Sequence, residues 1–139
     1  MKNVVLVILA GVLLSGCASL NFAGNEQAAE VAIEIAARRM TAVFCDKFPE
    51  DIDQGLAVTQ KLFVALDTPD TPWKNEFDEM VAFFQVRIVD DPYLVEDVRS
   101  LMRLGKWEGP DSAPPDERYL KAAVYGMKSA FAIEQAKRR

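Results

Sequence analysis

The chain contains no histidine and only two cysteines, Cys17 and Cys45, among its 139 residues. Histidine is the side chain that most often serves as a general base near neutral pH, and it is the commonest ligand of transition metals. Catalytic triads centred on histidine and metal sites with imidazole ligands are therefore excluded. The two cysteines allow one disulfide bond at most.

The chain also lacks a hydrophobic run long enough to cross a bilayer. Its longest run, Val4 to Leu14, has eleven residues, which as a helix is about 17 Å long against a hydrocarbon core of about 30 Å. A basic residue, Lys2, precedes the run, and the small residues Ser15 and Gly16 follow it. This is the pattern of an export signal rather than of a transmembrane helix.

The four residues that close this run, Leu14-Ser15-Gly16-Cys17, resemble the lipobox of bacterial lipoprotein precursors. The resemblance implies cleavage between Gly16 and Cys17, removal of residues 1–16, and a diacylglyceryl group and further acyl chains on Cys17. It implies no cofactor beyond this lipid. Because no aspartate follows the cysteine, it also implies the periplasmic face of the outer membrane of a Gram-negative cell. An ordinary cleaved export signal is the alternative interpretation.

The resemblance also implies that residues 17–24 form a short tether from the lipidated cysteine, and residues 25–139 are expected to form one domain. The segment from Ala18 to Gly24 spans at most about 25 Å when fully extended, so the domain is expected close to the membrane. Half of the full chain is apolar and 27% is charged, which is ordinary composition for a globular domain with its own core.

From Asn25 onward, hydrophobic residues recur at intervals of three and four, which is typical of amphipathic helices. Asn25 is a plausible N-cap, Thr71-Pro72 and Asp91-Pro92 each predict a capped helix start with proline in the first turn, and Pro115 opens the last helix. No stretch alternates in the manner of a strand. The sequence predicts an all-α fold, a compact bundle of four to five helices, with helices over about 25–48, 50–67, 72–88, 92–104 and 115–139.

Small residues at Ala122, Gly126 and Ala130 stand four apart on the last helix. A glycine inside a helix costs roughly 1 kcal/mol relative to alanine. A closely packed neighbouring helix is the expected reason for it.

The chain carries a formal net charge of −5, yet residues 118–139 hold six basic residues against one acidic residue, Glu134. The rest of the chain, called the acidic body here, carries an excess of negative charge, which argues against nucleic acid as a partner. The basic end can complement the dipole of the last helix and dock on the acidic body. Contact with lipid headgroups is the alternative.

Several carboxylates occur in adjacent groups. Paired carboxylates can perform acid and base chemistry on glycosidic bonds, but no catalytic motif accompanies them, and no metal site is expected. Because most of them fall near helix starts, stabilisation of helix N-termini is the favoured interpretation. These groups are Glu50, Asp51 and Asp53; Asp90 and Asp91; and Glu96 and Asp97.

Cys45 falls in line with Glu34, Arg38 and Thr41 on the one polar stripe of the first helix. Cysteine is usually buried, so a place in the core is expected. A thiol near the surface that contacts a partner, or forms an intermolecular disulfide, is the alternative.

Trp73 and Trp107 lie at or beside connections between helices. Tryptophan in such a place can contact a partner protein, and both residues are candidates for that role. Closure of one end of the bundle is the favoured interpretation for each, and partner contact is the alternative.

Together these features predict a membrane-anchored, non-enzymatic lipoprotein of the cell envelope whose helical domain contacts another envelope protein. Two alternatives stay open. One is a small enzyme that acts on the cell wall or on lipid through carboxylates, and the other is a carrier of an apolar ligand.

Overall fold

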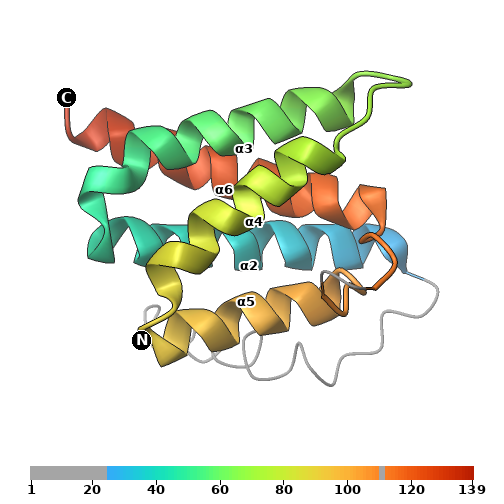
Figure 1. Ribbon diagram of the computed structural model, residues 1–139, viewed down its shortest axis with the longest axis horizontal. Coiled ribbons are helices and arrows are strands. Elements are labelled where there is room, and N and C mark those ends of the chain that lie inside the picture. Colours follow the sequence, from blue (N-terminus) through green and yellow to red (C-terminus); the bar gives the residue numbers. More distant parts are fainter. Residues whose placement is uncertain (1–24, 110–111) are drawn as a thin grey trace, which may run out of the picture.

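The structure is a computed structural model that describes residues 25–109 and 112–139. All regular structure in these ranges is helical (Figure 1), which confirms the predicted all-α bundle. The predicted signal peptide, the lipidation site Cys17 and the tether lie outside the described residues. The elements are α2 (Glu26–Lys47), the short 3-10 helix η1 (Pro49–Asp51), α3 (Ile52–Asp67), α4 (Lys74–Ile88), α5 (Pro92–Leu104) and α6 (Glu117–Lys137).

Two long helices, α2 and α6, run side by side in the same direction and form the centre of the molecule (Figure 1). Helix α3 runs antiparallel to them and packs on α6, whereas α5 runs antiparallel to α2 and packs on its other side. Helix α4 crosses the bundle diagonally, from the end of α3 to the start of α5. None of the helices in the described ranges is both long and apolar enough to cross a membrane.

The pair α2–α6 is held close by the small residues that the sequence places on α6. A Cβ atom added at Gly126 would overlap the backbone carbonyl oxygen of Glu34 and would lie 3.2 Å from the Cβ of Ala37. The predicted reason for a glycine within α6 is therefore confirmed.

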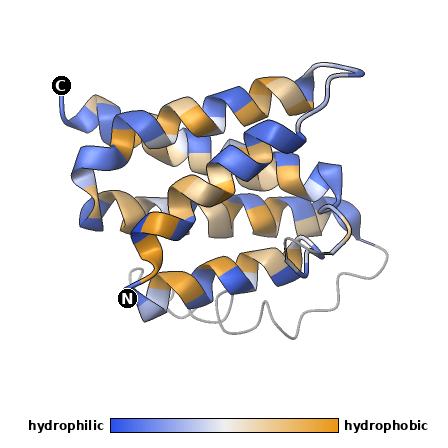
Figure 2. Ribbon diagram, viewed as in Figure 1, coloured by the Kyte–Doolittle hydropathy of each residue, from blue (hydrophilic) through white to orange (hydrophobic). Residues whose placement is uncertain are grey.

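A cluster of phenylalanines fills the middle of the core. The ring of Phe44 on α2 lies 5.7 Å from Phe83, 5.1 Å from Phe84 and 6.0 Å from Phe131, measured between centroids. Tilted and edge-on arrangements of this kind are the favourable ones for aromatic pairs. Figure 2 shows hydrophobic and hydrophilic residues interspersed along each helix, as expected of amphipathic helices.

Two helix starts agree with the sequence and three differ. The Asn25 side chain accepts a hydrogen bond from Ala28 N, and the Asp91 side chain accepts from Tyr93 N and Leu94 N, so both residues cap as predicted. Helix α6 begins two residues after Pro115, with Asp116 as its cap. These caps satisfy backbone N–H groups that have no partner inside the helix.

The predicted cap at Thr71 is wrong. The Thr68–Thr71 segment forms a tight turn in which Thr71 N donates to Thr68 O, and Asp70 adopts a left-handed φ of 56°. This turn holds Thr71 away from the helix, which begins only at Lys74. The second start, at Glu50, is also displaced, because η1 occupies Pro49–Asp51 before α3 begins.

The basic end of the chain docks on acidic side chains of other helices. Arg118 forms an ion pair with Glu26 at the start of α2, and Lys121 Nζ lies 2.6 Å from Asp67 Oδ1 at the end of α3. Lys137 stands in the last turn of α6, where a cation complements the helix dipole. The expected docking on the acidic body is confirmed for these residues.

Candidate functional site

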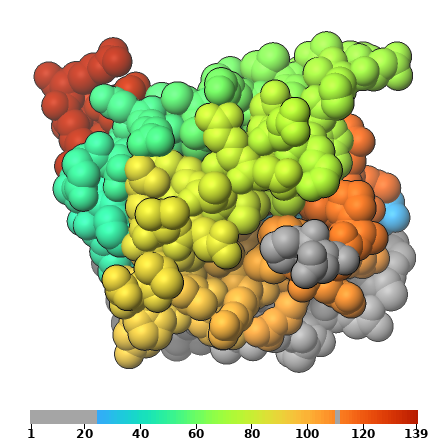
Figure 3. Space-filling view, viewed as in Figure 1, coloured from blue at the N-terminus to red at the C-terminus, as the bar shows by residue number. Residues whose placement is uncertain are grey.

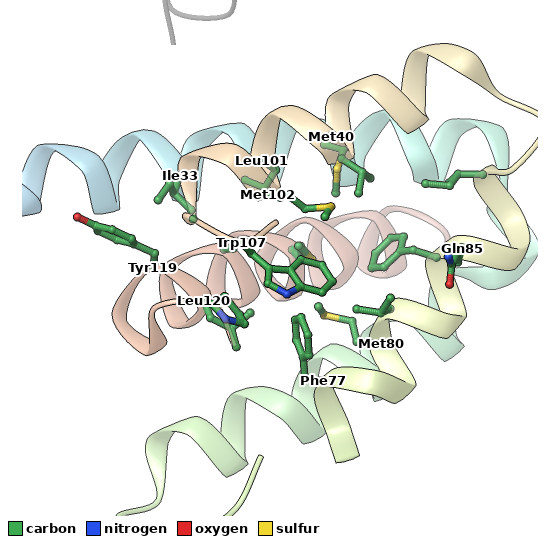
Figure 4. Close-up of a pocket in the computed structure, with 18 residues that line it drawn as sticks. Ile33, Met40, Phe77, Met80, Gln85, Leu101, Met102, Trp107, Tyr119 and Leu120 are labelled. Carbon is green, nitrogen blue, oxygen red and sulfur yellow. The ribbon is translucent and has the colours of Figure 1, made fainter. Parts of the chain in front are cut away.

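A cavity of about 190 Å³ lies between α2, α4, α5 and α6 (Figure 4). Its lining is almost wholly apolar, with Gln85 and Tyr119 as the polar side chains. An engineered apolar cavity of about 150 Å³ is large enough to bind benzene. The cavity is therefore large enough for part of an apolar molecule.

The cavity exists because α4 and α5 diverge. They are joined by the short connection Val89–Asp91, and from there α4 runs diagonally while α5 follows α2 (Figure 1). Figure 3 shows the face on which the two helices lie side by side. Of α5, only Leu94 is fully buried, and Val98 and Leu101 are half-buried against the core. This wall of the cavity is consequently the least firmly packed one.

Methionine is concentrated in this cavity. Met40 on α2, Met80 on α4, Met102 on α5 and Met127 on α6 all line it, and the only other methionine of the chain is Met1. Methionine has three rotatable bonds and a polarisable sulfur, so it adapts to irregular shapes and is common at apolar binding surfaces. A lining that combines methionines from four helices can adjust to an occupant.

Trp107 projects between α4 and α5 into the lining, as Figure 4 shows. Its ring meets the Phe77 ring edge-on at 4.9 Å, and the Trp73 ring meets the same Phe77 at 5.9 Å. Both tryptophans are half-buried. The structure thus brings the two predicted tryptophans to one phenylalanine and makes Trp107 a wall of the cavity, while partner contact by either stays a prediction.

The chain reverses after α5 through a Schellman motif that delivers Trp107 to this position. Trp107 N donates to Met102 O, and Lys106 N donates to Arg103 O. The residue that adopts the left-handed conformation is Lys106, with φ 57°, and not the preceding Gly105. Glycine is the usual residue at this position because its backbone reaches positive φ without strain.

Two members of the first group of carboxylates, Asp51 and Asp53, are engaged in structural contacts. Asp51 Oδ2 lies 2.8 Å from Arg87 Nε, and Asp53 Oδ1 accepts a hydrogen bond of 2.7 Å from Gln135 Nε2. Asp91 caps α5 and pairs with Lys47, and this hydrogen bond holds the pKa of the Asp91 carboxyl below its usual range. Stabilisation of a helix N-terminus is confirmed for Asp91.

Glu96 and Asp97 do not stand at a helix start, and that interpretation is wrong for them. They lie in the middle of α5 because the helix begins at Pro92. Glu96 Oε1 accepts from Arg103 Nη2 at 2.9 Å. Burial raises the pKa of the Asp97 carboxyl, and the neighbouring charge of Asp91 adds to this. Neither residue lines the apolar cavity.

Cys45 is fully buried, as expected. Burial raises the pKa of its thiol to about 12 from an ordinary 9.0. Contact of Cys45 with a partner in this folded state is therefore wrong. The predicted polar stripe turns inward at its end, where α2 packs against α6. Thr41 is also fully buried, and its hydroxyl donates to Ala37 O.

Sequence reasoning did not find the cavity. One signal pointed to it, namely that the methionines after Met1 each fall on the apolar stripe of a different helix. Within residues 25–109 and 112–139, no group of three or more Cys, Asp or Glu side chains could hold a metal ion.

Comparison of the chain with known proteins finds no matching family model, no matching curated protein and no matching solved structure.

Proposed function

We propose that this protein is a non-enzymatic binding protein that takes up an apolar ligand in the cavity between α4 and α5. The single observation that carries the proposal is the apolar, methionine-rich lining formed by four helices. Ligand sites are typically concave and mostly apolar with few polar groups. The lipobox at Leu14–Cys17 supports a place for this protein on an envelope membrane, where apolar ligands are abundant.

The proposal predicts that alkyl ligands bind with an affinity that rises with chain length. Each methylene buried contributes about 0.8 kcal/mol, or about fourfold in Kd. Titration with a series of straight-chain alcohols should follow this trend until the cavity is full. With methyl-labelled methionine, the resonances of Met40, Met80, Met102 and Met127 should shift together in the NMR spectrum.

A matched pair of variants on α6 tests the location. Ala123 lines the cavity, whereas Ala132 is exposed on the same helix. Ala123→Leu should fill part of the cavity and weaken alcohol binding at least several-fold, while Ala132→Leu should bind as the parent does. Equal binding by both variants, with both folded by circular dichroism, would contradict the proposed site.

Contact with a protein partner is a second candidate function, favoured by an apolar corner between α4 and α5. Val86, Val89 and Tyr93 are 75%, 66% and 82% exposed there. Large exposed apolar groups that gather in one place often mark interaction sites. Figure 2 shows the hydrophobic colour at this corner of the fold.

A photo-crosslinking residue at position 93 tests this second candidate. It should yield one stoichiometric adduct in the cell envelope, and the same probe at Val64, an exposed valine on α3, should yield none. The adduct should disappear when Val86 and Val89 are both replaced by aspartate. An unchanged adduct in that double variant would rule out the corner as the contact.

A further inference from the structure

A second hollow, wider and more open than the apolar cavity, adjoins it at the end of α5. It measures about 630 Å³ and is lined by Arg99, Met102, Arg103, Lys106, Trp107 and Glu108. Met102 and Trp107 line both hollows. These two side chains therefore form the boundary between an apolar compartment and a polar one.

The polar compartment is basic, although the chain as a whole is acidic. Three cations, Arg99, Arg103 and Lys106, stand against the carboxylates of Glu96 and Glu108. Glu96 is shared between the two arginines, 2.9 Å from Arg103 Nη2 and 3.5 Å from Arg99 Nη1. Positive charge thus remains in excess over negative charge in this hollow.

Lys106 connects the two compartments. Its ammonium group lies 5.7 Å from the centroid of the Tyr119 ring, and Tyr119 lines the apolar cavity. Lys106 also occupies the left-handed position of the Schellman motif, where a side chain costs about 1–2 kcal/mol.

We propose that the two hollows together bind one anionic amphiphile with a single hydrocarbon chain. The chain lies in the cavity beneath Trp107, and the carboxylate or phosphate head lies beside Arg99, Arg103 and Lys106. This inference rests on the proposed function and adds the charge and shape of the ligand. A free fatty acid and a single-chain phospholipid share this chemistry.

The binding test compares ligands that share the same hydrocarbon chain and differ in the head group. All fully buried side chains that the structure describes lie between Ala29 and Phe131, so residues 18–139 retain the described core. For the protein comprising residues 18–139, with folding verified by circular dichroism, calorimetric titration should give decanoate and decyl phosphate an affinity about tenfold or more above that of decanol. Decyltrimethylammonium should bind more weakly than decanol, and added salt should weaken only the anions.

Two double variants with the same change in charge locate the head. Arg103→Gln with Lys106→Gln should lower the affinity for decanoate about tenfold and leave that for decanol unchanged. The control, Lys61→Gln with Lys74→Gln, removes two exposed cations from α3 and α4 and should change neither. A single-chain phospholipid titrated beside decanoate then shows which natural head is preferred, and preference for either supports the proposal.

The outcomes separate this inference from the function on which it rests. Equal affinity for decanoate, decanol and the cationic amphiphile would overturn the anionic head but leave the apolar site standing. No binding of any decyl compound would overturn both. Binding by residues 18–139 but not by the lipidated protein would assign the cavity to the protein's own acyl chains and would overturn a free amphiphile as ligand.

Discussion

Gly126 is the residue at which the two central helices come closest, because its missing side chain leaves room for the backbone of α2. Alanine is the better helix former by about 1 kcal/mol. The new methyl group would nevertheless press on the carbonyl of Glu34, and overpacking of this kind costs about 1–3 kcal/mol or more. Because the added methyl group would meet backbone rather than a flexible side chain, the cost of overpacking exceeds the gain in helix propensity.

Gly126→Ala is therefore expected to lower the free energy of unfolding by about 1–3 kcal/mol, measured by urea denaturation. Gly105→Ala provides the control, because the nearest atom to an added Cβ there is 3.6 Å away. That variant should be as stable as the parent or slightly more so. A stabilised Gly126→Ala protein would show that α2 and α6 do not pack this closely.

Cys45 is expected to be chemically silent in the folded protein, because its thiol is buried and its pKa is raised to about 12. Iodoacetamide at pH 8 should label it only after unfolding in urea. Since the unfolded thiol ionises near 9.0 while the folded one does not, the contribution of this group to stability should be present below pH 9.0 and decline as the pH rises towards 12. Rapid labelling of the native protein would contradict the buried position.

At the scale of single residues, the sequence pattern predicts burial correctly for residues on clear apolar stripes. It fails where a polar stripe passes from solvent into the core. Leu120, Val124 and Phe131 on α6 are buried as their spacing indicates. The polar stripe of α2 is half-exposed at Glu34 and fully buried at Thr41. Helical spacing predicts the direction in which a side chain points, but only the packing of neighbouring helices, here α6 on α2, determines whether that side chain is exposed to solvent.

Among the α-helices, α5 is the least embedded, since one of its thirteen residues is buried against eight of twenty-one in α6. It ends in the Schellman motif that carries Lys106 at φ 57°. A lysine there costs about 1–2 kcal/mol relative to an unstrained conformation, whereas glycine costs about 0.5–1 kcal/mol in chain entropy. The balance favours glycine for stability.

Lys106→Gly should accordingly raise the free energy of unfolding by about 0.5–1 kcal/mol, seen as a higher urea midpoint at constant m value. The same variant should bind decanoate more weakly, so that stability and binding change in opposite directions. Lys106→Gln, which keeps the strain but loses the charge, should weaken binding without the gain in stability. If Lys106→Gly were destabilised, the motif would not be strained by its side chain.

Helix starts show how far local chemistry alone determines an element. Asp91-Pro92 begins α5 as predicted, because the side chain accepts from two backbone N–H groups. Thr71-Pro72 offers the same chemistry but lies within a turn that forms its own hydrogen bond to Thr68. Two local structures compete for the same residues there, and the sequence pattern alone does not rank them.

At the scale of the whole molecule, the cavity depends on the angle between α4 and α5, which the sequence pattern does not predict. The stripes on α4 and α5 predict that both face the core, which is correct for Phe77, Phe84 and Leu94. The stripes do not determine how far α4 and α5 diverge, because that angle depends on the surface of α2 and α6 on which both helices pack. A site formed between elements is therefore harder to predict than the elements themselves.

The start of α2 lies at the same end of the molecule as the basic hollow. The start of α2 lies beside the start of α6, since Glu26 pairs with Arg118, and the next residue, Tyr119, lines the cavity beside Lys106. The turn η1 lies at the opposite end of α2, about 33 Å away along a helix of 22 residues. If Cys17 is lipidated, we expect the basic hollow at the end of the molecule nearer the membrane and η1 at the far end.

Spin labels on the lipidated protein bound to vesicles test this orientation, in a Cys45→Ala background that leaves Cys17 free for lipidation. A label at Lys106→Cys should be relaxed strongly by a nickel chelate attached to lipid headgroups, because the segment from Cys17 to Asn25 spans at most about 28 Å. A label at Glu50→Cys, in η1, should be relaxed much less. Equal or stronger relaxation at position 50 would mean that the mouth of the cavity faces away from the membrane, so that a ligand would have to arrive from the aqueous side.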